Sequence, residues 1–295
     1  THSDTLSLHD ALPISGRPIK HGYYELPSGL SPLQILNHLQ EGTQWRMPPG
    51  EVPDELKVTI PEGLTIVQMA AQFADPEAFR EAAADPQLIA RLGLDVPNLE
   101  GFLMPNTYYF EEKPDERAVV ERLLSHFEHE YAELRKELPE TAERDLLEVV
   151  TVASLIEEEC RVDEERPLVA AVIYNRLKAG MPLDLDSTLQ YALGKYGERI
   201  LNEDKETDSP YNTYRRKGLP PGPISNPGVA CLRAALQPAE EDYLFFVSNA
   251  DGKTHTFSTT MNEHAEAVRR FRREIAVQRR ELRDRETRGE ENDAQ

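Results

Sequence analysis

The sequence is short of basic residues and contains no long apolar run, and each shortage excludes a class of protein. Lysine and arginine number 33 against 53 aspartates and glutamates, which gives a formal net charge of −20. Binding the phosphates of a nucleic acid needs a local surplus of positive charge, so we expect no nucleic-acid partner. A membrane-spanning helix needs about 18 or more consecutive apolar residues. The chain as given has no such run, so it is not expected to span a membrane.

Cysteines and the common enzyme motifs are also scarce. Cys160 and Cys231 fit no metal-ligand spacing, so two free thiols and one disulfide both stay open. The sequence lacks a P-loop, a G-x-S-x-G elbow, an H-E-x-x-H zinc motif and a dinucleotide fingerprint. The pair Asp184 and Asp186 has a spacing that can bind metal, but such loop carboxylates are more often solvated or helix caps. We therefore expect neither a cofactor nor a metal.

The length of 295 residues leaves room for two domains, and 39% hydrophobic residues can form a core. Residues 1–15 have an unrelated composition and back-translate to a string that resembles a sequencing-library adapter. We set them aside as an assembly artefact. The rest divides into an N-terminal region over 16–98, a catalytic domain over 99–276 and a charged tail over 277–295.

Two segments of the N-terminal region repeat each other, 24-YELPSGLSPLQIL-36 and 58-VTIPEGLTIVQMA-70. Each predicts a short strand, a Pro-x-Gly turn, a Ser or Thr N-cap and an amphipathic helix. Two generic strand–turn–helix units are one interpretation. The other is a small module that resembles LysM, a fold that binds peptidoglycan or chitin.

The remainder alternates predicted helices with one predicted β-hairpin. Apolar periodicity and capping residues predict the following helices: 114–137, 141–178 with a break near Pro167, 186–192, 229–236, and a last one capped by Asn262. Strands are expected at 243–248 and 254–258, around an Asp-Gly turn. Residues 207–228 are too rich in proline, glycine and polar residues for regular structure, and long ordered loops are commonly functional. The class is α+β.

Three consecutive glutamates follow the apolar start of 151-TVASLIEEECRVDEERPLVAAVIYNRL-177. Helical spacing places Glu157 on a stripe of apolar or small residues: Leu146, Val150, Ala153 and Cys160. Glu158 and Glu159 continue more polar or mixed faces. A carboxyl on the apolar stripe loses hydration, and a neutral acid can protonate a leaving oxygen. An acidic cluster at a helix end is more often simply solvated, so periodicity alone leaves both interpretations open.

Several motifs together resemble the YceG-like family of endolytic murein transglycosylases, in the family's order from Tyr24 to Phe271. They are VTIPEGLTIVQMA, LEGFLMPNTYYF, VASLIEEE, VAAVIYNRLKAGMPLDLDSTLQYALG, SPYNTYRRKGLPPGPISNPG and YLFFVSNADGKTHTFSTT. The family's catalytic glutamate follows an Ala-Ser-apolar-apolar run, which matches Glu157 here. The resemblance implies that the cleft is lined by Ser187, Thr188, Gln190, Tyr211, Asn212, Tyr214 and Asn226.

The resemblance also implies a reaction and a place. Such an enzyme cuts the MurNAc–GlcNAc β-1,4 bond in nascent peptidoglycan strands and leaves 1,6-anhydro-MurNAc ends. It is held in the bacterial inner membrane by one N-terminal helix, which this chain lacks, with its catalytic domain in the periplasm. Peptidoglycan synthases are the partners that this location suggests. The sequence departs from the family at Glu158, where lysine is familiar, and in LMPN, which stands where LFPDT is commoner.

Two other functions stay open on the sequence. A hydrolytic muramidase would need a second carboxylate near Glu157, with Glu159, Asp184 or Asp186 as the candidates. A peptidoglycan-binding or division scaffold would need no catalyst at all.

Overall fold

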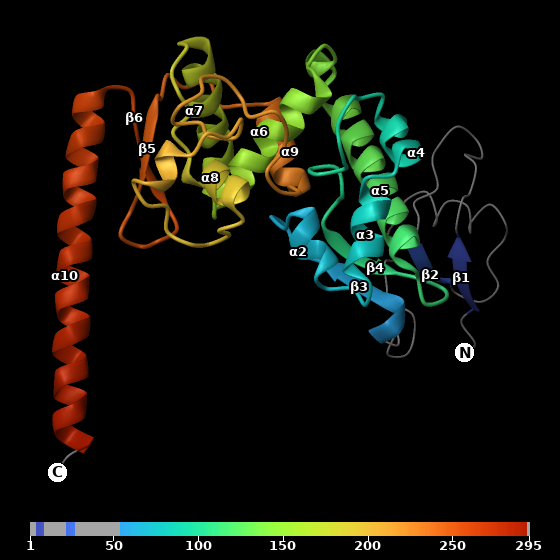
Figure 1. The fold of residues 1–295 in the computed structure, drawn as a ribbon, viewed down its shortest axis with the longest axis horizontal. Helices are drawn as coiled ribbons and strands as arrows, with labels where there is room; N and C mark the ends of the chain where they lie inside the picture. Colours follow the sequence, from blue (N-terminus) through green and yellow to red (C-terminus); the bar gives the residue numbers. More distant parts are fainter. Residues whose placement is uncertain (1–3, 9–21, 27–53, 294–295) are drawn as a thin grey trace. The chain divides into compact units, whose positions relative to one another are not determined.

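A computed structural model describes residues 4–8, 22–26 and 54–293 (Figure 1). The chain forms two compact units, one of residues 1–58 and 108–113, the other of residues 59–107 and 114–295. Most of the first repeat copy lies outside the described residues. The functional argument therefore rests on the second unit.

In the first unit, β1 (Asp4–Leu8) and β2 (Gly22–Leu26) pair antiparallel, with Asp4 opposite Leu26 and Leu8 opposite Gly22. The strand β1 lies inside residues 1–15, which the sequence analysis set aside. A short 3-10 helix, η1 (Asp54–Leu56), leads into β3 (Lys57–Ile60).

The second repeat copy folds as predicted, into a strand, a turn, a capped start and a helix. After β3 the chain turns at Gly63, whose φ is +78°, and enters α2 (Ile66–Ala70). Thr65 caps α2, because its hydroxyl accepts from the amide of Gln68 while the Gln68 side chain accepts from the amide of Thr65. β3 forms a two-stranded sheet with β4 (Asn106–Tyr109). This confirms the unit, although not a LysM fold.

Helices make up most of the second unit. They are α3 (Pro76–Ala83), α4 (Pro86–Ile89), α5 (Glu116–Glu137), α6 (Leu146–Glu159), α7 (Arg166–Lys178), α8 (Asp186–Leu193), α9 (Val229–Leu236) and α10 (Met261–Asp293), joined by the short 3-10 helices η2 (Ala90–Leu92), η3 (Pro139–Thr141), η4 (Asp163–Glu165) and η5 (Asp204–Glu206). The predicted helices over 114–137, 186–192 and 229–236 are confirmed. The predicted region 141–178 is two helices, α6 and α7, with Pro167 in the first turn of α7, where its missing N–H costs nothing.

The helix α6 is the centre of the second unit and packs on α7, α8 and α9. Every residue from Val149 to Ile156 is buried, Thr151 and Ser154 included. A helix that is buried all round has no solvent face. The predicted polar face is therefore wrong for the middle of α6, where Thr151 and Ser154 are buried. At the end of the helix the prediction agrees with the structure, because Glu157 is half-buried and Glu158 is exposed.

The predicted hairpin is confirmed as β5 (Phe245–Ser248) and β6 (His255–Ser258), with Phe245 opposite Ser258. α10 packs on both strands. Its predicted cap, Asn262, is wrong, because the helix begins at Met261 and the hydroxyl of Thr260 accepts from the amide of Glu263. The helices and two-stranded sheets of the described residues confirm the α+β class.

Candidate active site

Glu157 lies in the last turn of α6, at the point where this buried helix reaches the surface. Its side chain is half-buried. The amide of Gly228, the N-cap residue of α9, donates to Oε2 of Glu157 at 2.9 Å. A backbone N–H at the start of a helix attracts the oxygen of a carboxyl group. This contact therefore orients the Glu157 side chain.

A buried thiol and a guanidinium lie behind Glu157. The thiol of Cys231 hydrogen-bonds with Glu157, and burial raises the pKa of Cys231, so the thiol keeps its proton and donates it. Nε of Arg166 in turn donates to Sγ of Cys231 at 3.2 Å. Cys160 and Cys231 are both free and buried. Sequence reasoning missed Cys231, because no motif links a single buried cysteine to a glutamate in another helix.

A third segment, the turn from Pro61 to Gly63, brings another carboxylate to Glu157. The amide of Gly63 donates to the carbonyl of Asn226 at 3.0 Å, and the amide of Asn226 donates to the carbonyl of Leu64 at 3.0 Å. These two bonds hold the turn against the residues that precede α9. As a result the side chain of Glu62 lies over Gly228, with Oε1 only 1.9 Å from the place where a Cβ at Gly228 would stand.

We call Glu62, Glu157 and Glu158 the carboxylate cluster. The pKa of Glu158 is raised to about 7, mainly by loss of hydration among the surrounding side chains, although the residue keeps contact with solvent. A hydrogen bond with Ser225 opposes this shift, and the charge of Glu157 adds to it. The pKa of Glu62 is also raised, first by partial burial and then by the charge of Glu157, while Arg166 acts in the opposite direction. Like charges are thus concentrated at this end of α6.

Asn226 joins the segment that carries Glu62 to residues 100–103. The side-chain oxygen accepts from the amides of Gly101 and Leu103, at 2.9 and 3.0 Å. The side-chain nitrogen donates to the carbonyl of Leu64 at 2.9 Å and to Oε1 of Glu100 at 2.8 Å. An asparagine amide can make four such bonds, and all four are made here, at a residue with 0% exposure. Asn226 was predicted to contact sugar, and the structure gives it the position of an internal junction instead.

Glu100, beside Asn226, is a buried acid that the sequence analysis did not single out. It is 6% exposed, and burial raises its pKa to about 8. The amide of Ile66 at the start of α2 donates to its carboxyl, and the hydroxyl of Tyr191 lies 3.4 Å from Oε2. Its hydrogen bonds to Ile66 and Asn226 are buried, so its contribution is to the frame that holds the Pro61–Gly63 turn.

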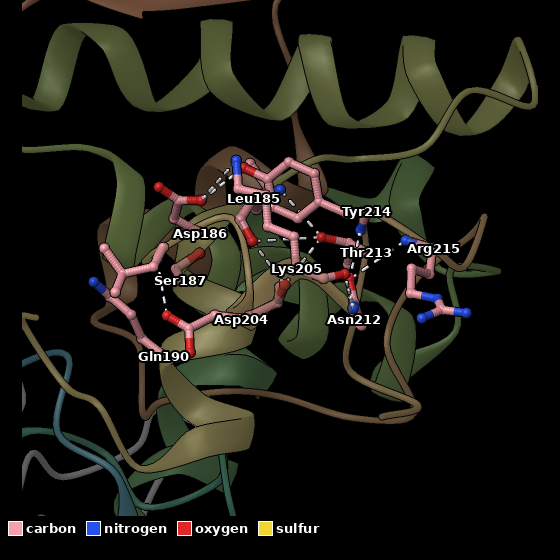
Figure 2. A network of polar contacts seen from close by, with 12 residues as sticks. Leu185, Asp186, Ser187, Gln190, Asp204, Lys205, Asn212, Thr213, Tyr214 and Arg215 are labelled. Atoms are coloured by element: carbon pink, nitrogen blue, oxygen red, sulfur yellow. Dashed lines mark hydrogen bonds and ion pairs between the residues drawn. The ribbon is translucent and has the colours of Figure 1, made fainter. Parts of the chain in front are cut away.

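Residues 212–215 of the loop of residues 207–228 belong to a second polar network, which Figure 2 shows together with the start of α8. Asn212 is its centre. Its side-chain nitrogen donates to the carbonyls of Lys205 and Thr207, and its oxygen accepts from the amides of Tyr214 and Arg215. We call the hydrogen bonds made by the side chains of Asn212 and Asn226, two separate sets, the amide network. Both side chains are fully buried and fully bonded, so neither presents a group to a ligand.

The other predicted cleft residues fall into two groups. Ser187 and Thr188 are buried; Ser187 donates to Oε1 of Glu159 at 2.7 Å, and Thr188 donates to the carbonyl of Leu185 at 2.8 Å. Gln190 and Tyr214 are half-buried. Gln190 donates to the carbonyl of Glu198, and the hydroxyl of Tyr214 donates to Oδ1 of Asp186 at 2.6 Å.

Tyr211 is also half-buried, but it differs from these residues because its ring packs against Tyr191, at a centroid distance of 4.9 Å. An aromatic pair at the edge of the loop is suited to contact with a sugar ring.

The predicted candidates for a second carboxylate have other partners. Glu159 binds Ser187, Asp186 accepts from Tyr214, and Asp184 lies 3.6 Å from Arg176. Within the described ranges, no three His, Cys, Asp or Glu residues gather as metal ligands. Glu62, which the sequence does not predict as a candidate, instead lies against Gly228, the residue whose amide binds Glu157.

A cavity of about 570 Å³ opens beside Glu62. Polar and apolar residues of β3, β4, α5 and α9 line it: Thr59, Ile60, Pro61, Glu62, Met104, Pro105, Asn106, Thr107, His126, Glu130, Val229 and Ala230. Glu157 is not part of this lining, so Glu62 and the start of α9 are what connect the cavity to it.

Comparison with known proteins identifies the family. The model of the YceG-like family matches residues 4–270. An endolytic murein transglycosylase of Bacillus subtilis is 34% identical over 275 residues, which cover 85% of this chain and 72% of that protein. One from Streptococcus pneumoniae is 29% identical, and the chain spans about half of it, 49%. The crystal structure of a yceG-like protein from Listeria monocytogenes matches with a TM-score of 0.65 and 33% identity, over 84% of this chain and 85% of that one.

In the part of the chain that the structure describes, no helix is both long and apolar enough to cross a membrane. The family match covers both the carboxylate cluster and the amide network. The chain belongs to the YceG-like family.

Proposed function

We propose that this protein is an endolytic lytic transglycosylase that cuts the β-1,4 bond between MurNAc and GlcNAc in peptidoglycan and leaves 1,6-anhydro-MurNAc ends. The observation that carries the proposal is the position of Glu157: a half-buried carboxyl at the end of a buried helix, oriented by the amide of Gly228. The names of the Bacillus and Streptococcus relatives support the same reaction.

The chemistry needs an acid that is fixed and shielded but open on one side. Glu157, when protonated, gives its proton to the glycosidic oxygen while an oxocarbenium-like transition state forms. The 6-hydroxyl of MurNAc then attacks C1 within the same sugar and gives its proton to a carboxylate of the site, so water is not the nucleophile. The fold supplies the orientation on which such an intramolecular step depends. Tyr211, on the edge of the ordered loop, is our candidate for a sugar-ring contact.

The finer parts of the proposal concern binding and place. We propose that the strand–turn–helix unit of residues 58–70 contacts the glycan next to Glu157, because its turn carries Glu62, which lies against Gly228. We also propose that the domain works outside the cytoplasmic membrane, where its substrate lies, next to peptidoglycan synthases. Fractionation of cells that make the natural full-length protein, with and without a protease outside the membrane, would test this location.

Mass spectrometry of digested peptidoglycan tests the reaction. The protein, its Glu157→Gln variant and the Glu148→Gln variant are compared; Glu148 is an exposed glutamate in the first turn of the same helix. We expect anhydro-MurNAc ends from the protein and from Glu148→Gln, and a loss of at least about 10²-fold in Glu157→Gln, in the range that general acid catalysis contributes.

Each other outcome has a definite meaning. Reducing MurNAc ends would mean that water attacks and that the protein is a muramidase. Full activity of Glu157→Gln would remove Glu157 from the mechanism. Binding of glycan without any cleavage would indicate a scaffold and overturn the proposed reaction.

A further inference from the structure

Glu62 and Glu157 both lie against Gly228. The amide of Gly228 donates to Oε2 of Glu157 at 2.9 Å, and Oε1 of Glu62 lies 1.9 Å from the Cβ position of Gly228. With ordinary backbone bond lengths, these two contacts hold the carboxyl oxygens no more than about 7 Å apart. Paired carboxylates of glycoside hydrolases act on one bond at comparable separations, roughly 5 to 9.5 Å.

Glu62 is placed where its carboxyl can contact a bound ligand. The residue is exposed, and it lines the cavity of about 570 Å³, whereas Glu157 is half-buried behind it. Its turn is fixed by the two backbone bonds to Asn226, so the carboxyl is presented from a rigid segment. The raised pKa of Glu62, caused by partial burial and by the charge of Glu157, makes it a better proton acceptor than an ordinary surface glutamate.

The stereochemistry of the proposed reaction places its acid and its base on one face of the sugar, where either one carboxyl acting twice or two neighbouring carboxyls can supply them. The 1,6-anhydro bridge forms on the β face of the MurNAc ring, which is also the face that the leaving oxygen departs from. The group that protonates the leaving oxygen and the group that takes the proton from the 6-hydroxyl must therefore lie on one side of the sugar. Two carboxyls gathered around one glycine satisfy this requirement.

We propose that Glu62 is the general base of the transglycosylation, with Glu157 as the acid; this rests on the function proposed above. Glu157 gives its proton to O4 of the departing GlcNAc as the C1–O4 bond breaks. O6 bonds to C1 and gives its proton to the Glu62 carboxylate. That proton returns to Glu157 when the products leave, directly or through solvent, and the cycle is balanced without a further reactant.

Gly228 allows this arrangement, and it offers an independent probe of it. Its φ of −74° and ψ of 166° are open to any residue, so alanine fits the backbone. A methyl group there would occupy the space of the Glu62 carboxyl, which stands at the end of a flexible, exposed side chain and would move away. Gly228→Ala thus displaces the charge of Glu62 without removing it, and it keeps the N–H that binds Glu157.

Steady-state kinetics on two substrates separate the acid from the base. One substrate is a peptidoglycan glycan strand; the other is a glycan oligomer whose terminal MurNAc carries a dinitrophenyl group at C1, which leaves without protonation. On the natural strand, Glu62→Gln is expected to lower kcat by about 10²-fold with little change in KM. On the activated substrate, Glu157→Gln recovers most of its activity and Glu62→Gln does not, because the 6-hydroxyl still needs a base.

A double-mutant cycle gives the second test. Gly228→Ala is expected to lower kcat by about 10-fold in the unmutated protein and to change it less than about twofold in a Glu62→Ala background, because the displaced carboxyl is then absent. Circular dichroism and the unfolding temperature of each variant show whether the fold is retained.

The outcomes separate this inference from the function it rests on. If the unmutated protein leaves no anhydro ends, the proposed function fails. If it does leave them, and folded Glu62→Gln keeps its kcat or is rescued by the activated substrate, only the role of Glu62 is overturned. An equal effect of Gly228→Ala with and without Glu62 would likewise remove Glu62 from the explanation.

Discussion

The carboxylate cluster and the amide network are both polar regions of the second unit, but their burial and their hydrogen bonding differ. Asn212 and Asn226 make every bond that an amide can make, at 0% exposure. Glu62 and Glu157 carry like charges near each other and keep contact with solvent. Polar groups that are fully bonded stabilise a fold, whereas like charges held together cost stability and are typical of reactive sites.

The comparison also explains how the cluster is kept in place. Glu62 is carried by the Pro61–Gly63 turn, which bonds to Asn226. Glu157 and Glu158 are carried by α6, whose Ser154 bonds to Ile224 and Ser225, the residues just before Asn226. The bonds of Asn226 and of the residues just before it thus position groups that would otherwise repel one another. Substitutions in the network should lower stability, and substitutions in the cluster should lower activity.

The largest effect on stability is expected from Asn226→Ala. It removes four hydrogen bonds and leaves buried partners, among them the amides of Gly101 and Leu103, without a substitute. We expect a loss of about 3 to 5 kcal/mol in the free energy of unfolding, since each unsatisfied buried group costs about 1 to 3 kcal/mol. Urea unfolding followed by circular dichroism measures it.

Asn249→Ala is the matched control for Asn226→Ala. Asn249 also bonds through both ends of its amide, with Thr254 and Thr256, but it lies half-buried in the β5–β6 turn. Water can replace those partners, so the expected loss is below about 1 kcal/mol. Equal losses in the two variants would contradict the junction role of Asn226.

The sequence predicts the elements around these regions well where the signal is local. The helix α9 and the β5–β6 hairpin follow from caps, turns and periodicity within a few residues. The role of Asn226 is different, because its bond to Leu64 joins positions 162 residues apart. No pattern within one segment contains that information. The placement of Glu62 over Gly228 was missed for the same reason.

Two features of the sequence indicate Glu157, and they differ in value. The helical stripe distinguishes it weakly: Glu157 is less exposed than Glu158, but Ser154 on the predicted polar face is also buried, at 0% exposure. The Ala-Ser-apolar-apolar-Glu motif does distinguish it, because a motif records which carboxyl a family uses and not only which face is apolar. Its catalytic role stays a prediction until Glu157→Gln is measured.

A more gradual effect, spread over several pH units, is expected from Glu100. Its pKa is about 8 in the folded protein and near 4.5 in an unfolded chain, so between these values the folded state holds one proton more. Stability should therefore fall as the pH rises from about 4.5 to 8, by up to about 1.4 kcal/mol per pH unit, and level off above pH 8.

Glu100→Gln should remove this part of the slope. A neutral amide has the same shape, and its oxygen can still accept from the amide of Ile66 and from Asn226. Unfolding measured between pH 5 and 9 is expected to give a flatter profile for the variant and a higher stability than the unmutated protein at pH 9. Identical slopes would mean that Glu100 is charged in the folded protein at neutral pH.

The smallest effect is expected from Glu158→Gln, and it tests whether the carboxylate cluster is electrically coupled. Because the pKa of Glu158 is about 7, its side chain is mostly neutral at pH 5.5 and mostly charged at pH 8.5. A negative charge a few ångströms from the oxocarbenium-like transition state stabilises it by roughly 0.5 to 1 kcal/mol in a watery surrounding. The glutamine variant resembles the neutral form, so its activity should equal that of the unmutated protein at pH 5.5. At pH 8.5 the activity of the variant should be about threefold lower than that of the unmutated protein. A ratio that does not change with pH would mean that Glu158 is screened from the reacting sugar, and the coupling would then be confined to Glu62 and Glu157.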